Sequence, residues 1–279
     1  MTVRAAREDD LEQAAELVRV LDPAAIVSAA SLRHRLPDAF VAEAEGEVVG
    51  WAVAPGGWIF VGVRPDRRRQ GIGGALLDRV RERRQSDRVV AFALDADGAR
   101  FLERRGFERS ATLRLSILDL RTAVLPELPE SELAVVTLAR VRDRPRELYE
   151  LYMDTLSDVP NAEAFLEQSL EEWRGHVLDH PHLDDEVSVV VLDGERPVAL
   201  AWLLREGVRA AAEYAGTARS HRGRGLATLA KLASTRAARD AGVERITTEN
   251  DVENAPMLAI NRRLGFEPGE ELHQYARVL

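Results

Sequence analysis

The chain contains two segments of closely similar sequence. The stretch VRPDRRRQGIGGALLDRV (63–80) has a counterpart in TARSHRGRGLATLAKLAS (217–234). Aligning Arg68 with Arg222 gives an offset of 222 − 68 = 154 residues. A match of this kind within one chain raises the question of a duplication, which further matches in the same order would support.

Two further correspondences follow the same order along the chain. RRGFE (104–108) matches RLGFE (263–267) at an offset of 265 − 106 = 159 residues. Upstream, the hairpin pattern AEGEVVGWAV around Gly46 resembles LDGERPVALAWLL around Gly194. Three ordered matches at nearly constant offset exclude a chance similarity, and 279 residues suffice for two domains.

The two copies are joined by RTAVLPELPESE (121–132). Two prolines and the lack of periodicity are typical of a linker, and place the boundary near Leu128. We expect an N-terminal domain of residues 1–125 and a C-terminal domain of residues 130–279.

Each copy shows the same order of patterns. An amphipathic helical region precedes a hairpin, a strand, a glycine-containing turn with a helix, and then a second strand, a second helix and a final strand. WIFVGV (58–63) and SVVVL (188–192) are rich in β-branched residues, and Pro145 suits a first helical position. The pattern predicts an α+β or mixed α/β fold.

The end of each copy is short. Residues 107–120 and 266–279 each supply little more than one strand. Either the last hairpin of each copy is abbreviated, or the two copies complete one another's sheets, and the sequence leaves both open.

Composition narrows the function classes. The chain is 46% hydrophobic and 30% charged, as expected of a globular protein, with a net charge of −9 that disfavours nucleic-acid binding. The absence of cysteine excludes disulfides, thiolate metal sites and a covalent cysteine intermediate. The N-terminus has no apolar signal core and no stretch approaches 18 apolar residues, so we expect a cytoplasmic protein without a membrane partner.

The most informative feature is an Arg-x-x-Gly-x-Gly/Ala turn between a strand and a helix, at 68–73 and again at 222–227. Glycine allows a ligand close to the backbone, and the first turn of a helix offers unpaired N–H groups that suit a pyrophosphate. A dinucleotide-binding turn does not fit, because its third glycine falls at Leu76 and Thr228. No Gly-Lys-Ser/Thr follows either turn, which excludes a P-loop.

On these residues, both copies resemble the GNAT family of acyl-CoA-dependent N-acetyltransferases, whose coenzyme A turn has the pattern Gln/Arg-x-x-Gly-x-Gly/Ala. ENAPMLAINRRLGFEP (253–268) is similar to the family's later motif, an Asn, a helix and Gly-Phe. The resemblance implies two tandem GNAT-like acyl-CoA N-acyltransferase domains. Each would have a splayed, mostly antiparallel sheet, with acetyl-CoA as co-substrate between its fourth and fifth strands.

The resemblance also implies residues that contact coenzyme A. The turn would hold the pyrophosphate, the end of the preceding strand would meet the pantetheine arm, and the residue that begins the last helix would lie near it. In the second copy these are Thr217, Arg222, Gly223, Arg224, Gly225, Leu226, Ala227 and Asn254; in the first they are Val63, Arg68, Arg69, Gln70, Gly71, Ile72 and Gly73, with Asp95 at the Asn position.

Acetyl transfer to an amine requires removal of a proton, because an ordinary amine has a pKa of about 10. Family members often carry a base on the strand before the turn. Glu213 stands four residues before Thr217, so strand alternation puts both on one face, and Glu213 is our candidate base. Without cysteine, we expect direct transfer in a ternary complex.

The acid that protonates the leaving thiolate is not evident. The family often places a tyrosine four residues before the glycine of Gly-Phe, and here those positions are Asn261 and Leu102. Asn261 can donate a hydrogen bond but cannot act as an acid. Tyr214, Tyr275 or a water molecule are the substitutes, and the second copy is the better candidate for catalysis.

We therefore expect an N-acetyltransferase acting on a primary amine of a small molecule. A catalytically silent acyl-CoA-binding or regulatory protein and a protein or peptide N-acetyltransferase are the alternatives. His176, His180 and His182 are spaced like metal ligands, but their place near a helix end before a proline favours capping or a contact with substrate, and we expect no metal. The oligomeric state and the acceptor are not predicted.

Overall fold

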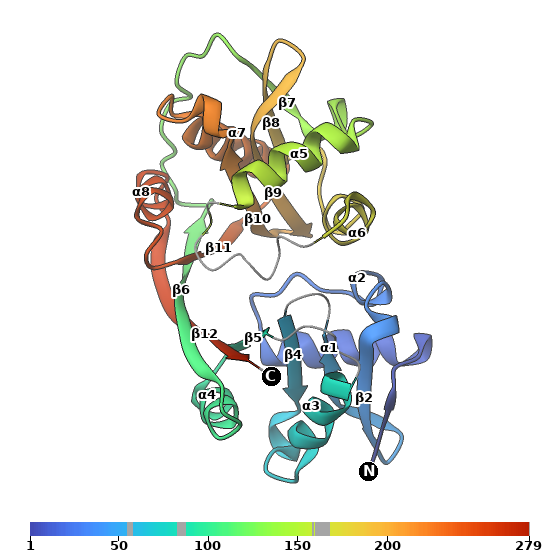
Figure 1. The fold of residues 1–279 in the computed structure, drawn as a ribbon. Helices are drawn as coiled ribbons and strands as arrows, with labels where there is room; N and C mark the ends of the chain where they lie inside the picture. Colours follow the sequence, from blue (N-terminus) through green and yellow to red (C-terminus); the bar gives the residue numbers. More distant parts are fainter. Residues whose placement is uncertain (55–57, 83–87, 158, 160–167, 279) are drawn as a thin grey trace. The chain divides into compact units, whose positions relative to one another are not determined.

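The structure is a computed structural model that describes residues 1–54, 58–82, 88–157, 159 and 168–278 (Figure 1). It divides into two compact units. Unit 1 comprises Met1–Thr112 and Leu272–Leu279, and unit 2 comprises Leu113–Glu271. No helix in the described part of the chain is both long and apolar enough to cross a membrane.

Unit 1 is a mostly antiparallel sheet covered on both faces. Its helices are α1 (Leu11–Leu21), α2 (Ala29–Arg33), α3 (Ile72–Glu82) and α4 (Ala96–Glu103). Ala39 and Val41 pack on the side of α1, whereas Phe40 and Ala42 pack on the side of α3, as strand alternation requires. The strands run in the order β1 (Thr2–Ala5), β2 (Ala39–Ala44), β3 (Glu47–Val53), β4 (Trp58–Val63), β5 (Arg88–Ala93) and the end of β12 (Glu267–Val278).

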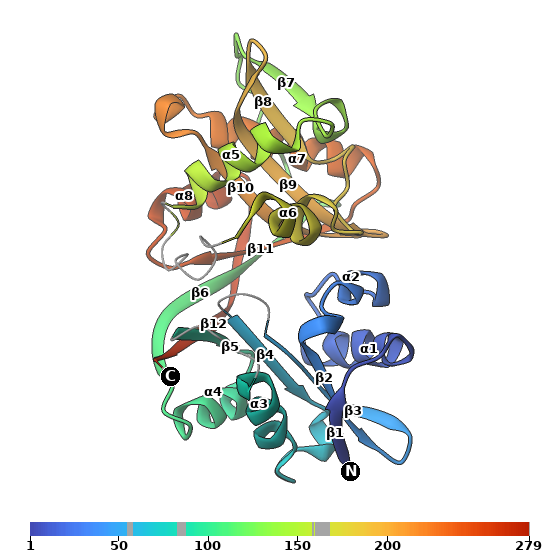
Figure 2. The same ribbon diagram turned by 45° about the vertical axis from the view of Figure 1, so that its right-hand side comes forward.

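Unit 2 repeats this plan. Helix α5 packs on one face of the sheet and α7 on the other, as Figure 2 shows. The helices are α5 (Pro145–Leu156), α6 (Leu170–Trp173), α7 (Leu226–Asp240) and α8 (Ala255–Arg263). The strands run in the order β6 (Glu108–Asp119), β11 (Arg245–Asp251), β10 (Arg209–Thr217), β9 (Arg196–Glu206), β8 (Val189–Asp193) and β7 (Ala134–Thr137).

Several local predictions are confirmed. Pro145 is the first residue of α5, and β4 spans the predicted residues 58–63. The hairpin turns lie at Gly46 and Gly194, both with positive φ, a conformation that glycine adopts without strain. The sequence did not reveal β1 and β7, because strands of four residues are too short to show a period.

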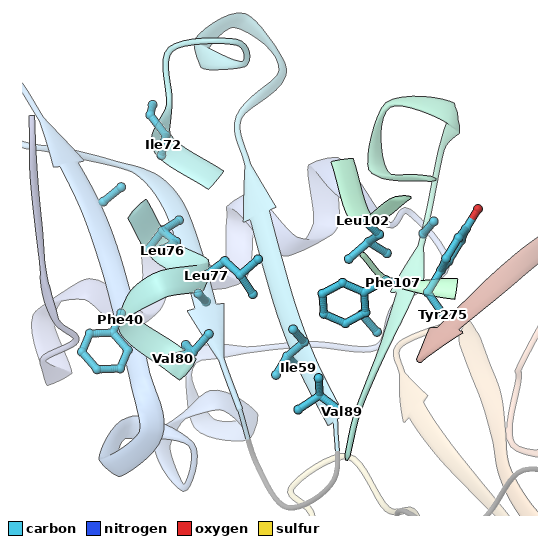
Figure 3. Packing of buried hydrophobic residues seen from close by; sticks show 14 of the residues in the cluster. Phe40, Ile59, Ile72, Leu76, Leu77, Val80, Val89, Leu102, Phe107 and Tyr275 are labelled. Atoms are coloured by element: carbon cyan, nitrogen blue, oxygen red, sulfur yellow. The ribbon is translucent and has the colours of Figure 1, made fainter. Parts of the chain in front are cut away.

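The last strand of each sequence copy belongs to the other unit's sheet. Residues 273–278 of β12 pair with β5 in unit 1, and residues 113–119 of β6 pair with β11 in unit 2. Figure 3 shows Tyr275 of β12 beside Leu102 and Phe107 in the core of unit 1. Of the two alternatives that the short tails left open, the copies complete one another's sheets. The expected boundaries at 125 and 130 follow the repeat, while the compact units divide at Thr112 and Glu271.

This exchange predicts that the first copy is unstable alone. A fragment of residues 1–125 lacks β12, which leaves β5 an open edge and removes buried Tyr275 from the core. We expect no cooperative thermal transition by circular dichroism for this fragment, and recovery of the transition when residues 126–279 are co-expressed. A fragment that melts like the intact chain would contradict the exchange.

Candidate active site

The parallel strands β10 and β11 of unit 2 separate after a short common ladder. They pair from Arg209 with Arg245 to Ala211 with Thr247, and no further pair forms between them among the described residues. Beyond this point, β10 remains paired with β9 on its other edge as far as Thr217. The backbone of residues 212–217 thus faces an opening between two strands, which an extended ligand can enter.

The turn after β10 is built to receive an anion. Gly223 and Gly225 have φ near +75°, and Gly225 is the N-cap of α7. The first hydrogen bond of α7 is from Leu229 N to Gly225 O, so the preceding N–H groups of the helix point out of its end. Nothing lies within 4 Å of a Cβ atom built at Gly223 or Gly225. Arg222 Nε donates to Thr217 O at 3.4 Å and holds the turn to the strand.

Unit 1 contains the same construction. Among the described residues, strands β4 and β5 pair from Trp58 with Val90 to Ile59 with Ala91 and no further. Arg68 Nε donates to Val63 O at 3.3 Å, the equivalent of the Arg222 bond. Gly71 has a φ of 83° and open space around it. The two turns that the sequence matched are therefore matched in their geometry as well.

Glu213 lies at an irregularity in β10. The register between β10 and β9 shifts between Ala212 and Tyr214, so Glu213 is the extra residue of a β-bulge and its side chain is exposed. Bulges of this kind re-aim a side chain next to active sites. The position beside the strand opening fits a base, although the bulge interrupts the simple alternation that the sequence suggested.

An aromatic wall stands next to Glu213. Burial, together with the negative charge of Glu213, raises the pKa of the Tyr152 phenol well above its ordinary value. The Tyr152 ring contacts that of Tyr214 with centroids 4.4 Å apart, and Trp202 stacks on it at 6.0 Å. Trp202 and Tyr152 are buried, so this aromatic wall belongs to the packed interior beside β10.

Tyr214 is held from α5. Its hydroxyl donates to Thr155 Oγ1 at 3.1 Å, and a side chain at Gly216 would come within 2.7 Å of Thr155. Helix and strand thus approach closely, and glycine at 216 permits it. Thr217 Oγ1, at the end of this strand, is buried with no hydrogen-bond partner in the described part of the chain. A buried orphan hydroxyl in the opening suits a polar ligand atom.

Asn254 and Asp95 occupy equivalent places, as the repeat suggests. Asn254 Oδ1 accepts from Met257 N at 3.2 Å and begins α8, while Asp95 Oδ1 accepts from Gly98 N at 2.7 Å and begins α4. Each side chain therefore caps the last helix of its copy. The two copies therefore share the capping role at this position and differ in the charge of the side chain that fills it.

Asn261 is buried in a polar chain rather than open to a ligand. It is 2% exposed, donates from Nδ2 to Asn250 Oδ1 at 2.6 Å, and accepts from Lys231 Nζ at 2.7 Å. Tyr275, an alternative acid for the second copy, lies in unit 1, where its hydroxyl donates to Glu103 Oε1. Lys231 is the chain's single lysine among 38 basic residues, a signal to which the sequence alone attached no role.

The opening of unit 1 contains a cavity of about 280 Å³. Arg68 pairs with Asp95 and Arg69 with Asp97, each at 2.7 Å, at the mouth of the turn. Burial raises the pKa of Asp95, but the Gly98 amide and Arg68 outweigh it and hold this pKa below the usual range. The Asp95 carboxylate is therefore ionised at neutral pH. Asp95 and Asp97 form ion pairs with the two guanidinium groups that would otherwise bind an anion.

His180 and His182, two of the three histidines that the sequence singled out, contact each other, and His221 in the turn after β10 has a contact of its own. His182 N donates to His180 Nδ1 at 3.2 Å, and His221 Nε2 contacts Asp193 Oδ2 at 3.0 Å. Within the residues that the structure describes, no group of three or more His, Cys, Asp or Glu side chains is placed to hold a metal ion.

The strand opening followed by a glycine turn, present in both units, fits an acyl-CoA-dependent acyltransferase. Comparison with known families leads to the same class. Residues 37–109 match the acetyltransferase (GNAT) domain, and residues 146–266 match the acetyltransferase (GNAT) family. The chain belongs to the GNAT superfamily as a tandem protein, and it is an N-acetyltransferase.

Individual relatives extend over nearly the whole chain. A mycothiol acetyltransferase from Clavibacter michiganensis subsp. michiganensis (strain NCPPB 382) is 29% identical over 84% of this chain and 78% of its own length. A GCN5-related N-acetyltransferase from Sphaerobacter thermophilus has a TM-score of 0.72 at 18% identity, covering 99% of this chain and 95% of that one. A tandem GNAT protein from the clavulanic acid biosynthesis pathway has a TM-score of 0.71 at 20% identity, with 99% and 98% covered. Both structures share the tandem fold.

Proposed function

We propose that the second copy transfers an acetyl group from acetyl-CoA to a primary amine of a small molecule. The observation that carries this proposal is the coincidence, on β10, of the strand opening, the glycine turn and Glu213 on its bulge. These three features supply a place for the pantetheine arm, a place for the pyrophosphate and a base within one strand length.

Each part of the coenzyme meets a suited group. The N–H groups at the start of α7 and the Arg222 and Arg224 guanidinium groups bind the pyrophosphate, and the edge of β10 ending at Thr217 pairs with the pantetheine amides. Asn254, the N-cap of α8, contacts the pantetheine arm in this proposal. The turn residues proposed to bind are Arg222, Gly223, Arg224, Gly225, Leu226 and Ala227.

The reaction is direct. The amine nitrogen attacks the thioester carbonyl, Glu213 takes the amine proton directly or through water, and a backbone N–H of β10 stabilises the oxyanion. Tyr214, which packs against the buried Tyr152 ring, orients the acceptor beside Glu213. No acyl-enzyme forms on cysteine, because the chain has none.

A panel of acceptors tests this proposal. With purified protein and acetyl-CoA, we expect thiol release that depends on a free small-molecule primary amine and gives an equal amount of amide. Acetylation of peptides but not of free amines would favour a protein acetyltransferase. Binding of acetyl-CoA without turnover on any amine would favour the silent, regulatory alternative.

We further propose that unit 1 binds coenzyme A weakly, through Val63 and the turn residues Arg68, Arg69, Gln70, Gly71, Ile72 and Gly73. Its cavity supports binding, and its two ionised carboxylates oppose the pyrophosphate. The first copy would then act as a scaffold rather than a second catalyst, because Ile59 and Val61 of β4 offer no base.

Asp95→Asn should therefore tighten binding in unit 1. Asparagine keeps the cap on Gly98 but releases Arg68 for the pyrophosphate, and we expect a Kd about five to ten times lower, since the pair is partly exposed. Calorimetry on the variant, with the second turn blocked by Gly225→Glu, measures this Kd alone. An unchanged or weaker Kd would contradict the role of the carboxylates.

A further inference from the structure

Lys231 is buried in unit 2 without a charged partner. Its side chain is 5% exposed, Nζ donates to Asn261 Oδ1 at 2.7 Å, and the Phe266 ring lies 5.4 Å away. No residue in the described ranges forms an ion pair with it. Because a buried ammonium loses its hydration, the pKa of Lys231 falls to about 8. Such a group gives up its proton near neutral pH.

The duplication shows that the fold does not need this lysine. By the offsets of the two motifs, Lys231 corresponds to Leu77 (231 − 77 = 154) and Asn261 to Leu102 (261 − 102 = 159). Both leucines are buried in the same apolar cluster of unit 1, where Figure 3 shows them. An apolar pair fills the position without the cost of desolvating a charge, so the Lys231–Asn261 pair points to a chemical role in unit 2.

Lys231 lies next to the strand segment that carries the proposed chemistry. It lines a cavity of about 10 Å³ together with Ala212, Tyr214 and Ala215. These three residues flank or follow the Glu213 bulge, beyond the point where β10 leaves β11. The cavity has room for at most one water molecule. Lys231 and this strand segment therefore border one small space, which at most one water molecule can fill.

We propose that Lys231 is the proton donor to the coenzyme A thiolate, an inference that rests on the function proposed above. When the tetrahedral intermediate collapses, the carbon–sulfur bond breaks and its electron pair stays on sulfur. Nζ gives a proton to the sulfur, which forms the coenzyme A thiol and leaves Lys231 neutral, and solvent then reprotonates Nζ. This supplies the acid that the sequence left unassigned.

Asn261 acts as a positioning residue for Lys231. Its carbonyl oxygen fixes one N–H of the ammonium, and its amide is itself held by Asn250. This chain orients the remaining Nζ protons, and it leaves the lysine without a carboxylate that would hold the proton too tightly.

The other side chains that face Lys231 are uncharged, so burial is the main cause of its lowered pKa. Met257, Phe266, Ile246, Ser234 and Thr235 carry no charge, and Tyr214 is the titratable side chain in the cavity lining, with its hydroxyl donated to Thr155. The charged residues on the same elements form no ion pair with Lys231 among the described residues. They are Arg209 and Glu213 on β10, Arg245, Glu249 and Asp251 on β11, Arg262 and Arg263 on α8, and Arg236, Arg239 and Asp240 on α7.

Lys231→Met tests the proposal against the matched variant Leu77→Met. A proton donor must be protonated, so in the wild type kcat should fall as the pH rises above about 8. In Lys231→Met we expect kcat to drop by about 100-fold and the decrease of kcat above about pH 8 (the alkaline fall) to vanish. The Kd for acetyl-CoA should stay within about threefold of the wild-type value. Leu77→Met should leave the rate and its pH profile unchanged.

Asn261→Asp separates proton donation from a structural role. A carboxylate beside Nζ raises the pKa of Lys231, so the alkaline fall should move to higher pH. Isotope-labelled lysine gives a single side-chain NMR signal in a chain with one lysine, and its titration midpoint should move by the same amount. If Lys231→Met fails to fold, the double change Lys231→Leu with Asn261→Leu reproduces the unit 1 packing and should fold but turn over slowly.

The outcomes distinguish the two proposals. Wild-type turnover that Lys231→Met leaves unchanged overturns the role of Lys231 and leaves the proposed function standing. If Asn261→Asp moves the titration midpoint of Lys231 but leaves the pH profile of kcat unchanged, the role of Lys231 as proton donor is also overturned. Absence of amine turnover in the wild type overturns both.

Discussion

Gly225→Glu is expected to reduce acetyl transfer at least 100-fold, through a higher Kd for acetyl-CoA. Gly225 is the N-cap of α7 with a φ of 75°, and nothing lies within 4 Å of a Cβ atom built there. The glutamate fits sterically at a backbone cost of about 1–2 kcal/mol. Its carboxylate then occupies the helix N-terminus, where it stabilises the helix and repels the pyrophosphate.

The equivalent change in unit 1 is the matched control. Gly71 has a φ of 83° and equally open surroundings, so Gly71→Glu carries a similar folding cost. We expect its rate of turnover to stay within about twofold of the wild type, with loss of the weaker coenzyme A site only. Initial rates of thiol release and calorimetric titration measure both. Loss of turnover in Gly71→Glu with retention in Gly225→Glu would assign catalysis to the first copy.

Glu213→Gln should lower kcat by about 100-fold while the KM for acetyl-CoA stays within about threefold. The amide has the shape of the carboxylate but cannot take the amine proton, and general-base catalysis contributes about 10²–10⁴-fold. Because Glu213 is exposed on its bulge, the substitution should leave the folded state intact.

Glu206→Gln, at the end of the adjoining strand β9, is the control for a lost surface charge. We expect its kcat within about twofold of the wild type. Steady-state kinetics with one saturating amine compare the variants. Equal kcat values for Glu213→Gln and the wild type would remove Glu213 from the reaction and leave water as the base.

Local sequence rules predicted much of this architecture. Glycine at a positive φ, proline at the first position of α5 and the strand–turn–helix around Arg68 and Arg222 depend on neighbouring residues. Because the two copies resemble each other, an element that was clear in one copy could be predicted at the matching place in the other. The family match then confirmed the fold class that they indicated.

Features that depend on residues far apart in the chain could not be predicted from the sequence. The pairing of β12 with β5 depends on which sheet edge the strand reaches, and β5 is far from β12 in the sequence. The bulge at Glu213 is a shift relative to β9, which the letters of β10 do not reveal. A lysine in a helix ordinarily extends to solvent, so the burial of Lys231 appears only when α7, α8 and Phe266 are in place.

The central claim is direct transfer of acetyl from acetyl-CoA to an amine in the second copy. Mass spectrometry of the protein and products after a single turnover tests it most directly. Protein incubated with acetyl-CoA alone should stay unacetylated, and addition of the amine should give amide and coenzyme A thiol in equal amounts. Acetyl-protein that forms first and passes its group to the amine, or no amide at all, would contradict the account.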